Sequence, residues 1–315
     1  MRGLAGLLAV GVLAIVPWAL AAPPASALLE RYEPILVLHP AERFAPAPVD
    51  GFIADSDLKQ RTANGSWQTA TGVPFPPPEV PGCTETTCWR LDQRSCAANA
   101  GLASIECYAG AEAAHGGAPT IYGASFRRGK QIALQYWLFY PYDFWSPKLP
   151  QSDEFWKAHE GDWEAVTVVL DASQRPVYVA ASRHCKGARR AWTKAQRVGQ
   201  RPVIYVSLGS HSHYFAPGER VEDPSCWPSE AVAIYKAYGV AMLDHAAAGR
   251  RIASLRLIPV TATSPSWMTF PGTWGEDQYA RFPNATFKFG AGPRGPVFHE
   301  LWRQPFTTPL GWPSE

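Results

Sequence analysis

The sequence predicts a mostly β protein, an antiparallel β-sandwich of the jelly-roll kind with irregular loops and one or two helices. Thirty prolines and 26 glycines are spread along the 315 residues and divide the chain into short segments. Between these breaks lie short runs rich in Val, Ile, Thr, Tyr and Trp, which favour strands. Because 46% of the residues are hydrophobic, the chain is able to bury a large core.

The strands are expected where an apolar or aromatic run is bounded by turn residues. These runs cover residues 35–38, 131–140, 165–170, 177–181, 203–208 and 256–261. One strong helix is expected over residues 229–248, because this segment starts with a Ser cap and ends before Gly249.

The N-terminal 27 residues contain one Arg, an apolar run, and then small residues in Ala-x-Ala patterns. This pattern predicts a cleaved signal peptide over residues 1–27. The alternative is a membrane anchor, because the run is near the lower length limit for spanning a bilayer. No later segment is as long and apolar, so residues 28–315 are expected to form one domain of a secreted or extracytoplasmic protein.

Six cysteines agree with an exported protein that contains disulfides. Four of them lie in a proline-rich segment at about residues 71–117, which is expected to be a cysteine-rich insertion forming a surface loop; a recognition element is the alternative. The gaps between these cysteines do not fit a structural zinc site. Proximity along the chain suggests three pairs: Cys83 with Cys88, Cys96 with Cys107, and Cys185 with Cys226.

Charge and motifs exclude several classes of function. With 29 Lys and Arg against 27 Asp and Glu, no overall field favours nucleic acid as a partner. The chain has no phosphate loop, so no nucleotide cofactor is expected, and no HExxH of the zinc proteases. It also lacks the GxSxG turn of serine hydrolases.

The segment HEGDWE, residues 159–164, carries one imidazole and three carboxylates and runs into an apolar strand. Strand alternation places Asp162 and Glu164 on one face, where two carboxylates repel unless a cation lies between them. Gly161 permits a bend in the chain that brings His159 to the face that carries Asp162 and Glu164. Three interpretations stay open: a divalent-metal site, an acid/base dyad and a solvated turn.

Asp143 follows the aromatic strand 131–140, and pairing of this strand with the one after Glu164 places Asp143 near the carboxylates. A set of one His and up to three carboxylates suits Mg²⁺ or Ca²⁺ better than Zn²⁺. Three further histidines are candidates for contacting the ligand side chains and not the metal itself, although a structural role is favoured for them: His184, His211 and His213.

Five motifs, in order, resemble the vacuolar-protein-sorting 62-like family, a domain of unknown function. They are ILVLHPAERFAPAPVDGFIADSDL, QYWLFYPYD, HEGDWEAVTVVLD, PVIYVSLGSHSHYF, and FPGTWGE followed by GPRGPVFHELWRQP. The resemblance covers nearly the whole chain after the signal peptide and is interrupted by the cysteine-rich insertion.

YPYD and HEGDWE are also similar, more distantly, to the necrosis- and ethylene-inducing-peptide-like proteins, secreted cytolysins with an actinoporin-like β-sandwich. Their heptad is Gly-His-Arg-His-Asp-Trp-Glu, so this chain departs from it at Ala158, Glu160 and Gly161. That family uses a divalent metal to bind a sphingolipid head group. The resemblance implies four metal ligands here: Asp143, His159, Asp162 and Glu164.

Three functions follow from these observations. The first is a secreted, divalent-metal-containing protein that recognises a surface glycan or lipid head group, with peripheral membrane contact as an option and with aromatic rings such as Trp145, Trp156 or Trp192 packing on the ligand. The second is a metal-assisted hydrolase with Glu160 or His184 as general base. The third is a disulfide-braced structural domain without metal.

Overall fold

The computed structural model describes residues 24–78, 80, 88–283 and 285–315. The expected signal peptide therefore lies almost wholly outside the described residues. The fold is mostly β, as the sequence predicts, and its largest sheet has eight strands in the order β16-β5-β6-β7-β18-β19, with β8 pairing β7 and β9 pairing β8. These strands are β5 (Thr120–Arg128), β6 (Gln131–Trp145), β7 (Trp156–Leu170), β8 (Pro176–Arg183), β9 (Lys186–Ala191), β16 (Arg256–Pro259), β18 (Gln278–Phe282) and β19 (Ala285–Gly290).

Three smaller sheets pack around this central sheet. The five-stranded one contains β1 (Ile35–Leu38), β10 (Arg197–Val198), β11 (Arg201–Val206), β12 (His213–Tyr214) and β15 (Arg251–Ile252). The four-stranded one contains β2 (Ser56–Arg61), β3 (Trp67–Thr69), β4 (Trp89–Gln93) and β17 (Thr273–Trp274). The last pairs β13 (Gly218–Val221) with β14 (Leu243–Ala246). All of the expected strands are present, but the sheets are mixed, because β1 runs parallel to β11, β16 to β5 and β17 to β4.

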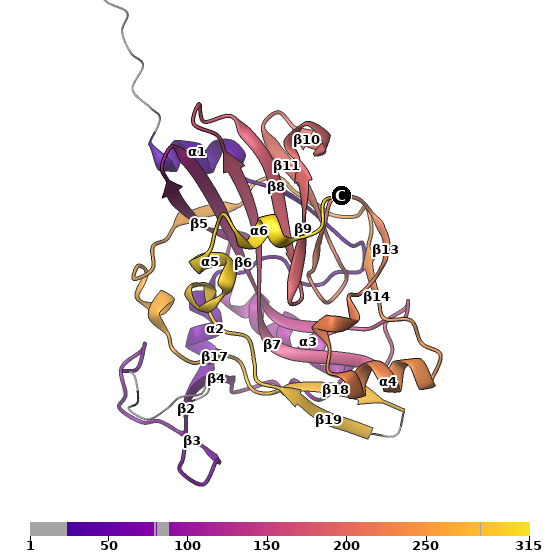
Figure 1. Cartoon of the computed structure of the whole chain (residues 1–315). Helices are drawn as coiled ribbons and strands as arrows, with labels where there is room; N and C mark the ends of the chain where they lie inside the picture. The colour runs from indigo at the N-terminus through magenta and orange to yellow at the C-terminus, as the bar shows by residue number, and fades with distance from the viewer. Residues whose placement is uncertain (1–23, 79, 81–87, 284) are drawn as a thin grey trace, which may run out of the picture.

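The two faces of the central sheet are buried against different partners, which gives the sandwich-like layering. Alternate residues of β6 point to opposite faces. Leu138 and Tyr140 join a core with Leu36 and Ile204 of the five-stranded sheet, whereas Phe139 joins the core on the other face. Figure 1 shows the C-terminal helices α5 (Glu300–Arg303) and α6 (Thr308–Gly311) in front of β5 to β9.

The helices are more numerous than the one or two that the sequence predicts, because most are too short to show a helical period. The described residues also contain α1 (Ala25–Tyr32), α2 (Val49–Asp55), α3 (Leu102–His115) and α4 (Ser229–Ala237), and four 3₁₀ helices, η1 (Trp192–Lys194), η2 (Pro224–Cys226), η3 (Ser266–Thr269) and η4 (Pro296–Phe298).

The prediction of one helix over residues 229–248 is wrong beyond Ala237. Gly239 adopts φ of 65°, and its N–H donates to the carbonyl of Lys236 while the N–H of Val240 donates to that of Tyr235. A left-handed glycine with such bonds ends a helix. The chain then forms β14 instead of further helical turns.

The cysteine-rich insertion is part of the core rather than a surface loop. It supplies β4 to the four-stranded sheet and α3, whose Ile105 and Tyr108 are buried in the core. The predicted disulfides Cys96–Cys107 and Cys185–Cys226 are both present. The third predicted pair involves Cys83, which lies outside the described residues.

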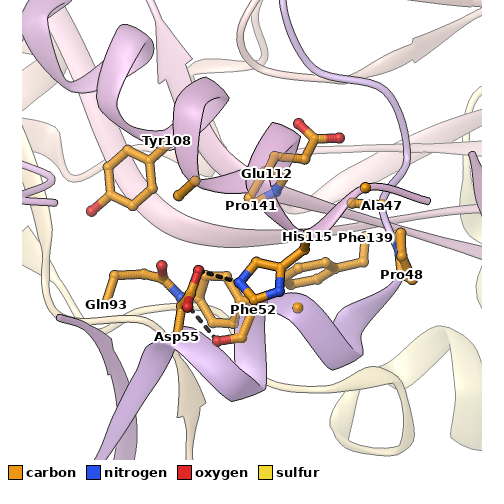
Figure 2. Close-up of a pocket in the computed structure, with 13 residues that line it drawn as sticks. Ala47, Pro48, Phe52, Asp55, Gln93, Tyr108, Glu112, His115, Phe139 and Pro141 are labelled. Carbon is orange, nitrogen blue, oxygen red and sulfur yellow. Dashed lines mark hydrogen bonds and ion pairs between the residues drawn. The ribbon is translucent and has the colours of Figure 1, made fainter. Parts of the chain in front are cut away.

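Figure 2 shows a small cavity between α3 and α2, where His115 forms an ion pair with Asp55. Its volume is about 30 Å³, which is room for one or two water molecules and not for an organic ligand. Glu112 borders this cavity, and burial raises the pKa of its carboxyl to about 7, against the opposing effect of Arg250.

The raised pKa of Glu112 predicts a pH-dependent stability. Because the folded protein holds this proton more tightly than the unfolded chain, the stabilising contribution is complete below about pH 4.5 and is lost as the pH rises through about 7. Glu112→Gln is expected to flatten this part of the profile and to be more stable than the parent at pH 8, as measured by urea unfolding from pH 4 to 8. Glu106→Gln, which removes an exposed carboxylate of α3, is the control, and an unchanged slope in Glu112→Gln would contradict the prediction.

Gly161 and Gly129 give a matched pair for backbone strain, with φ of 55° and 58°. A Cβ at Gly161 would lie 2.2 Å from the carbonyl oxygen of Trp274, whereas one at Gly129 would meet nothing within 4 Å. Gly129→Ala is therefore expected to cost about 1–2 kcal/mol of unfolding free energy, and Gly161→Ala about 3 kcal/mol or more. Equal losses in denaturant unfolding would show that the contact with Trp274 is unimportant.

Candidate metal centre

The long antiparallel ladder of β6 and β7 positions the residues of the candidate site. Its register places Asp143 opposite His159 and Tyr140 opposite Asp162. The aromatic strand before Asp143 therefore pairs with the strand after HEGDWE, as the sequence predicts. Residues 16 and 22 positions apart in the sequence become direct neighbours through this hairpin.

Gly161 breaks the alternation of side chains within β7. Its φ of 55° is open to glycine without a steric penalty, and no other residue has room beside Trp274. The ring of His159 turns back onto the bend and its Nδ1 lies 2.7 Å from the carbonyl oxygen of Gly161. A nitrogen that bonds a carbonyl is the protonated one, which leaves Nε2 as the nitrogen with a free lone pair.

Three of the four predicted ligands converge at this bend. Asp143, His159 and Asp162 each offer one ligand atom, and these atoms lie within 4.8 Å of one another. His159 Nε2 is 3.8 Å from Asp143 Oδ2. All three side chains are buried, and Asp143 Oδ1 has no hydrogen-bond partner among the described residues. A buried carboxylate oxygen without a donor is a costly feature that a bound cation would remove, so the residues fit a divalent metal.

The fourth predicted ligand, Glu164, lies outside this group, although it lines the same cavity. It accepts a hydrogen bond from Ser182, whose Oγ in turn accepts one from the N–H of Ala165 at 2.7 Å. Burial and the nearby charge of Asp162 raise the pKa of Glu164 well above its usual range. Burial likewise raises the pKa of Asp143, and Asp162 adds to that effect while His159 opposes it. The negative charge of Asp162 thus raises the pKa of both neighbouring carboxyls, which is the repulsion between carboxylates that the sequence predicts.

His211 forms a buried ion pair with Asp162. Its Nδ1 donates to Asp162 Oδ2 at 3.0 Å, and its Nε2 is 3.7 Å from Glu42 Oε1. The imidazole stacks on Tyr140 with ring centroids 3.9 Å apart. Burial acts to lower the pKa of His211, but Glu42 and Asp162 raise it to about 10, so the ring is positively charged at neutral pH. The pairing favours the ionised form of Asp162, whose pKa is lowered despite its burial.

The other two supporting histidines have different surroundings. His213 is buried, and burial lowers its pKa to about 4, so it is neutral. His184 Nε2 forms ion pairs with Glu222 and Asp244, which raise its pKa well above the usual value despite burial. Asp244 also accepts hydrogen bonds from Ser210 and Tyr214, both at 2.6 Å. His184, Glu222 and Asp244 form a second group whose ligand atoms lie within 4.8 Å of one another, and in it the ring of His184 is paired with both carboxylates.

Glu160, the other candidate general base, lies away from the site. Its carboxylate accepts hydrogen bonds from the hydroxyl of Tyr108 and from the backbone N–H groups of Gln93 and Glu276. These bonds link β7 to the cysteine-rich insertion. Glu160 does not line the cavity at the three converging ligands, so it has no access to a ligand bound in that cavity. Burial raises its pKa to about 7.

A cavity of about 360 Å³, here called the metal-side cavity, opens at the three converging ligands. Lys157, Trp163 and Trp227 line it together with Glu164 and His184. The three tryptophans expected to be exposed for ligand packing are buried instead: Trp145, Trp156 and Trp192.

Glu42, Glu222 and Asp244 are the site residues that the sequence did not indicate. Each contacts a histidine that is 38 to 169 positions away: Glu42 contacts His211, and the other two contact His184. No local spacing connects these partners, so only the assembled sheets reveal them.

The chain belongs to the family of Vacuolar protein sorting-associated protein 62, whose model matches residues 21–284. It is 24% identical over 213 residues to Vacuolar protein sorting-associated protein 62 of Saccharomyces cerevisiae, covering 55% of this chain and 42% of that protein. It is 25% identical over 207 residues to the putative vacuolar protein sorting-associated protein TDA6 of the same yeast, covering 53% and 42%. The match thus spans less than half the length of these relatives.

Solved structures similar to this chain include proteins of the necrosis- and ethylene-inducing kind. NLPPya in complex with glucosamine is 20% identical with a TM-score of 0.32, covering 61% of this chain and 66% of that one. The non-toxic HaNLP3 protein is 16% identical with a TM-score of 0.34, covering 78% and 80%. Likeness at this level carries no argument about the function of this chain.

Removing His211 is expected to destabilise the protein strongly, because Asp162 and Glu42 would then be buried without their cation. His211→Ala should lower the unfolding free energy at pH 7 by about 3–5 kcal/mol, measured by denaturant unfolding. His115→Ala is the matched control, because its ion pair with Asp55 is partly exposed and should contribute about 1 kcal/mol or less. Similar losses in the two variants would contradict a structural role for the charge on His211.

Proposed function

We propose that this protein is a secreted, divalent-metal-binding protein that recognises a surface glycan or lipid head group. The observation that carries the proposal is the convergence of Asp143, His159 and Asp162 at the edge of a cavity, with Asp143 Oδ1 unpaired. Two carboxylates and one imidazole are hard ligands that suit Mg²⁺ or Ca²⁺. A bound cation would supply a positive centre for hydroxyl or anionic oxygens of a ligand.

The metal-side cavity supports binding of a polar organic ligand. Its volume of about 360 Å³ is within the range of small-molecule sites. Its lining is mixed: the largely buried rings of Trp163 and Trp227 are apolar, and the side chains of Lys157 and Ser210 are polar. A sugar presents both apolar C–H faces and hydroxyl groups, so this mixed lining matches it.

Export agrees with the two disulfides in the described residues, since disulfides persist in oxidising compartments. In the part of the chain that the structure describes, no helix is both long and apolar enough to cross a bilayer. Contact with a membrane would in this proposal be peripheral and made through the head group.

Binding is favoured over metal-assisted hydrolysis because neither candidate base suits the reaction. Glu160 faces the insertion, away from the metal-side cavity. His184 lines the cavity, but its Nε2 is engaged by two carboxylates that keep the ring protonated. A protonated imidazole cannot accept a proton from water.

Metal analysis tests the first half of the proposal. The purified protein is expected to bind one Ca²⁺ or Mg²⁺ per chain, measured by calorimetry after treatment with chelator. Asp143→Asn and Asp162→Asn should each weaken binding by at least about tenfold, because each removes a charged ligand. Asp50→Asn, an exposed change on α2, should leave binding unaltered. Native protein that binds neither ion up to millimolar concentration would support the structural-domain alternative.

Glycan arrays and vesicles test the second half. The metal-loaded protein is expected to retain a glycan or a glycolipid-containing vesicle, and to release it on addition of EDTA. Asp162→Asn should abolish this retention while Asp50→Asn should not. The absence of any metal-dependent ligand would overturn the proposed recognition even if the metal binds.

A further inference from the structure

A second cavity, of about 500 Å³, adjoins the metal-side cavity. We call it the C-terminal cavity, because residues of α5, α6 and the chain beside them form one of its walls. Trp163, Glu164 and His184 line both cavities, so a ligand at the metal centre can extend into the second one. The residues that line the C-terminal cavity and not the metal-side cavity include Gln304, Thr307, Thr308 and Trp312.

Buried contacts hold the first part of this wall against the central sheet. The side-chain amide of Gln135 on β6 donates to the carbonyl oxygen of Leu301 at 2.7 Å and accepts from the indole N–H of Trp137 at 2.9 Å. Leu301 and Trp302 are buried in the same core as Trp163. The position of α5 is therefore fixed relative to Trp163, which lines both cavities.

Strand β9 fixes the second part. A Cβ at Gly187 would lie 2.5 Å from ring atoms of Trp312, so the ring packs directly on the strand at this glycine. The N–H of Arg189 donates to the carbonyl oxygen of Pro313, and its carbonyl accepts from the N–H of Glu315, both at 2.9 Å. The wall is thus built in advance, which reduces the entropy lost on binding a ligand.

The chemistry of the lining points to an uncharged, hydroxyl-rich ligand. Three of its charged side chains already have partners: Glu164 is bonded by Ser182, His184 by Asp244, and Lys186 by Asp223. The exposed carboxylate of Glu300 also lines the cavity, and such a group accepts hydrogen bonds from hydroxyls and repels an anionic ligand. The other groups that face a ligand are neutral, namely the ring of Trp312, the hydroxyls of Thr307 and Thr308, and the amide of Gln304. Thr307 donates to Gln304 Oε1 at 3.0 Å, which directs the amide nitrogen as a donor.

This wall lies outside the part of the chain that the family model matches. The model ends at residue 284, and it includes the three converging residues of the metal centre, whereas the wall begins at Glu300. The metal centre is therefore in the shared part of the chain, and the wall is in a part that the match does not reach.

From these observations we infer that the C-terminal cavity is a second sugar subsite, in which residues 300–312 determine specificity for a neutral oligosaccharide. One ring of the oligosaccharide binds at the metal centre, and the next ring packs on Trp312 and bonds to Gln304 and Thr308. The inference rests on the proposed function, because it assigns the extent and class of the ligand of the same site.

Calorimetry with mono- and trisaccharides tests the subsite. The probes are mannotriose, cellotriose, maltotriose and chitotriose with their monosaccharides, each added to Ca²⁺-loaded protein. At least one trisaccharide is expected to bind about tenfold or more tighter than its monosaccharide. The double variant Gln304→Ala with Thr308→Ala, which changes only side chains at the surface of the wall, should remove this gain, as should Trp312→Ala. Leu310→Ala, an exposed change on α6 outside the lining, is the matched control.

The outcomes separate the inference from the proposed function. Loss of the trisaccharide gain in the wall variants, with unchanged affinity for Ca²⁺ and for the monosaccharide, supports the subsite. Equal binding of mono- and trisaccharides by the parent, or a gain that survives in the wall variants, overturns the inference and leaves the metal centre as the sugar site. A parent protein that binds none of the probes in a metal-dependent way overturns the inference together with its sugar-binding basis, whereas Ca²⁺ binding itself is measured independently.

Discussion

Burial of several carboxylates around one bend of β7 is the constraint on which the rest of the site depends. Removing a charge from water is unfavourable, and like charges add to the cost when they are close. Two of the carboxylates are therefore hydrogen-bonded, Asp162 to the charged ring of His211 and Glu164 to Ser182, while Asp143 has His159 beside it at 3.8 Å. Asp143 Oδ1 is the atom that this arrangement leaves without a partner. A divalent cation is the group that best completes such a set.

The bend itself is fixed by packing on the opposite side of the strand. Trp163 lies between Asp162 and Glu164 in the sequence but faces the aromatic core, where it stacks on Trp267 and meets Trp274 edge-on. The backbone of Trp274 also occupies the space that a side chain at Gly161 would need. Core packing and ligand geometry are therefore coupled through neighbouring residues of one strand, so the ligands are held by the rigid part of the fold.

Two cavities lie at the candidate metal centre, and Trp163, Glu164 and His184 line both of them. The three converging ligands and most of the other residues that line the metal-side cavity lie inside the region that matches the Vacuolar protein sorting-associated protein 62 family. Helices α5 and α6, which lie beyond that region, form one wall of the C-terminal cavity. In the proposed function the first supplies the cation and the second the neutral contacts. Since affinity depends on the preorganisation of such contacts more than on their number, the bonds of Gln135 and Arg189 to the wall matter as much as the residues that face the ligand.

The sequence by itself predicted the mostly β fold, the strands and the convergence of Asp143, His159 and Asp162. These features depend on interactions between close neighbours: alternation along a strand, the freedom of Gly161, and one hairpin pairing β6 with β7. Tertiary structure alone decided that the helix after Ser229 ends at Ala237, that Glu160 faces Tyr108, and that His211 joins Asp162 to Glu42. Their partners come from distant parts of the chain, and their positions depend on which sheets pack together, for which the local pattern holds no signal.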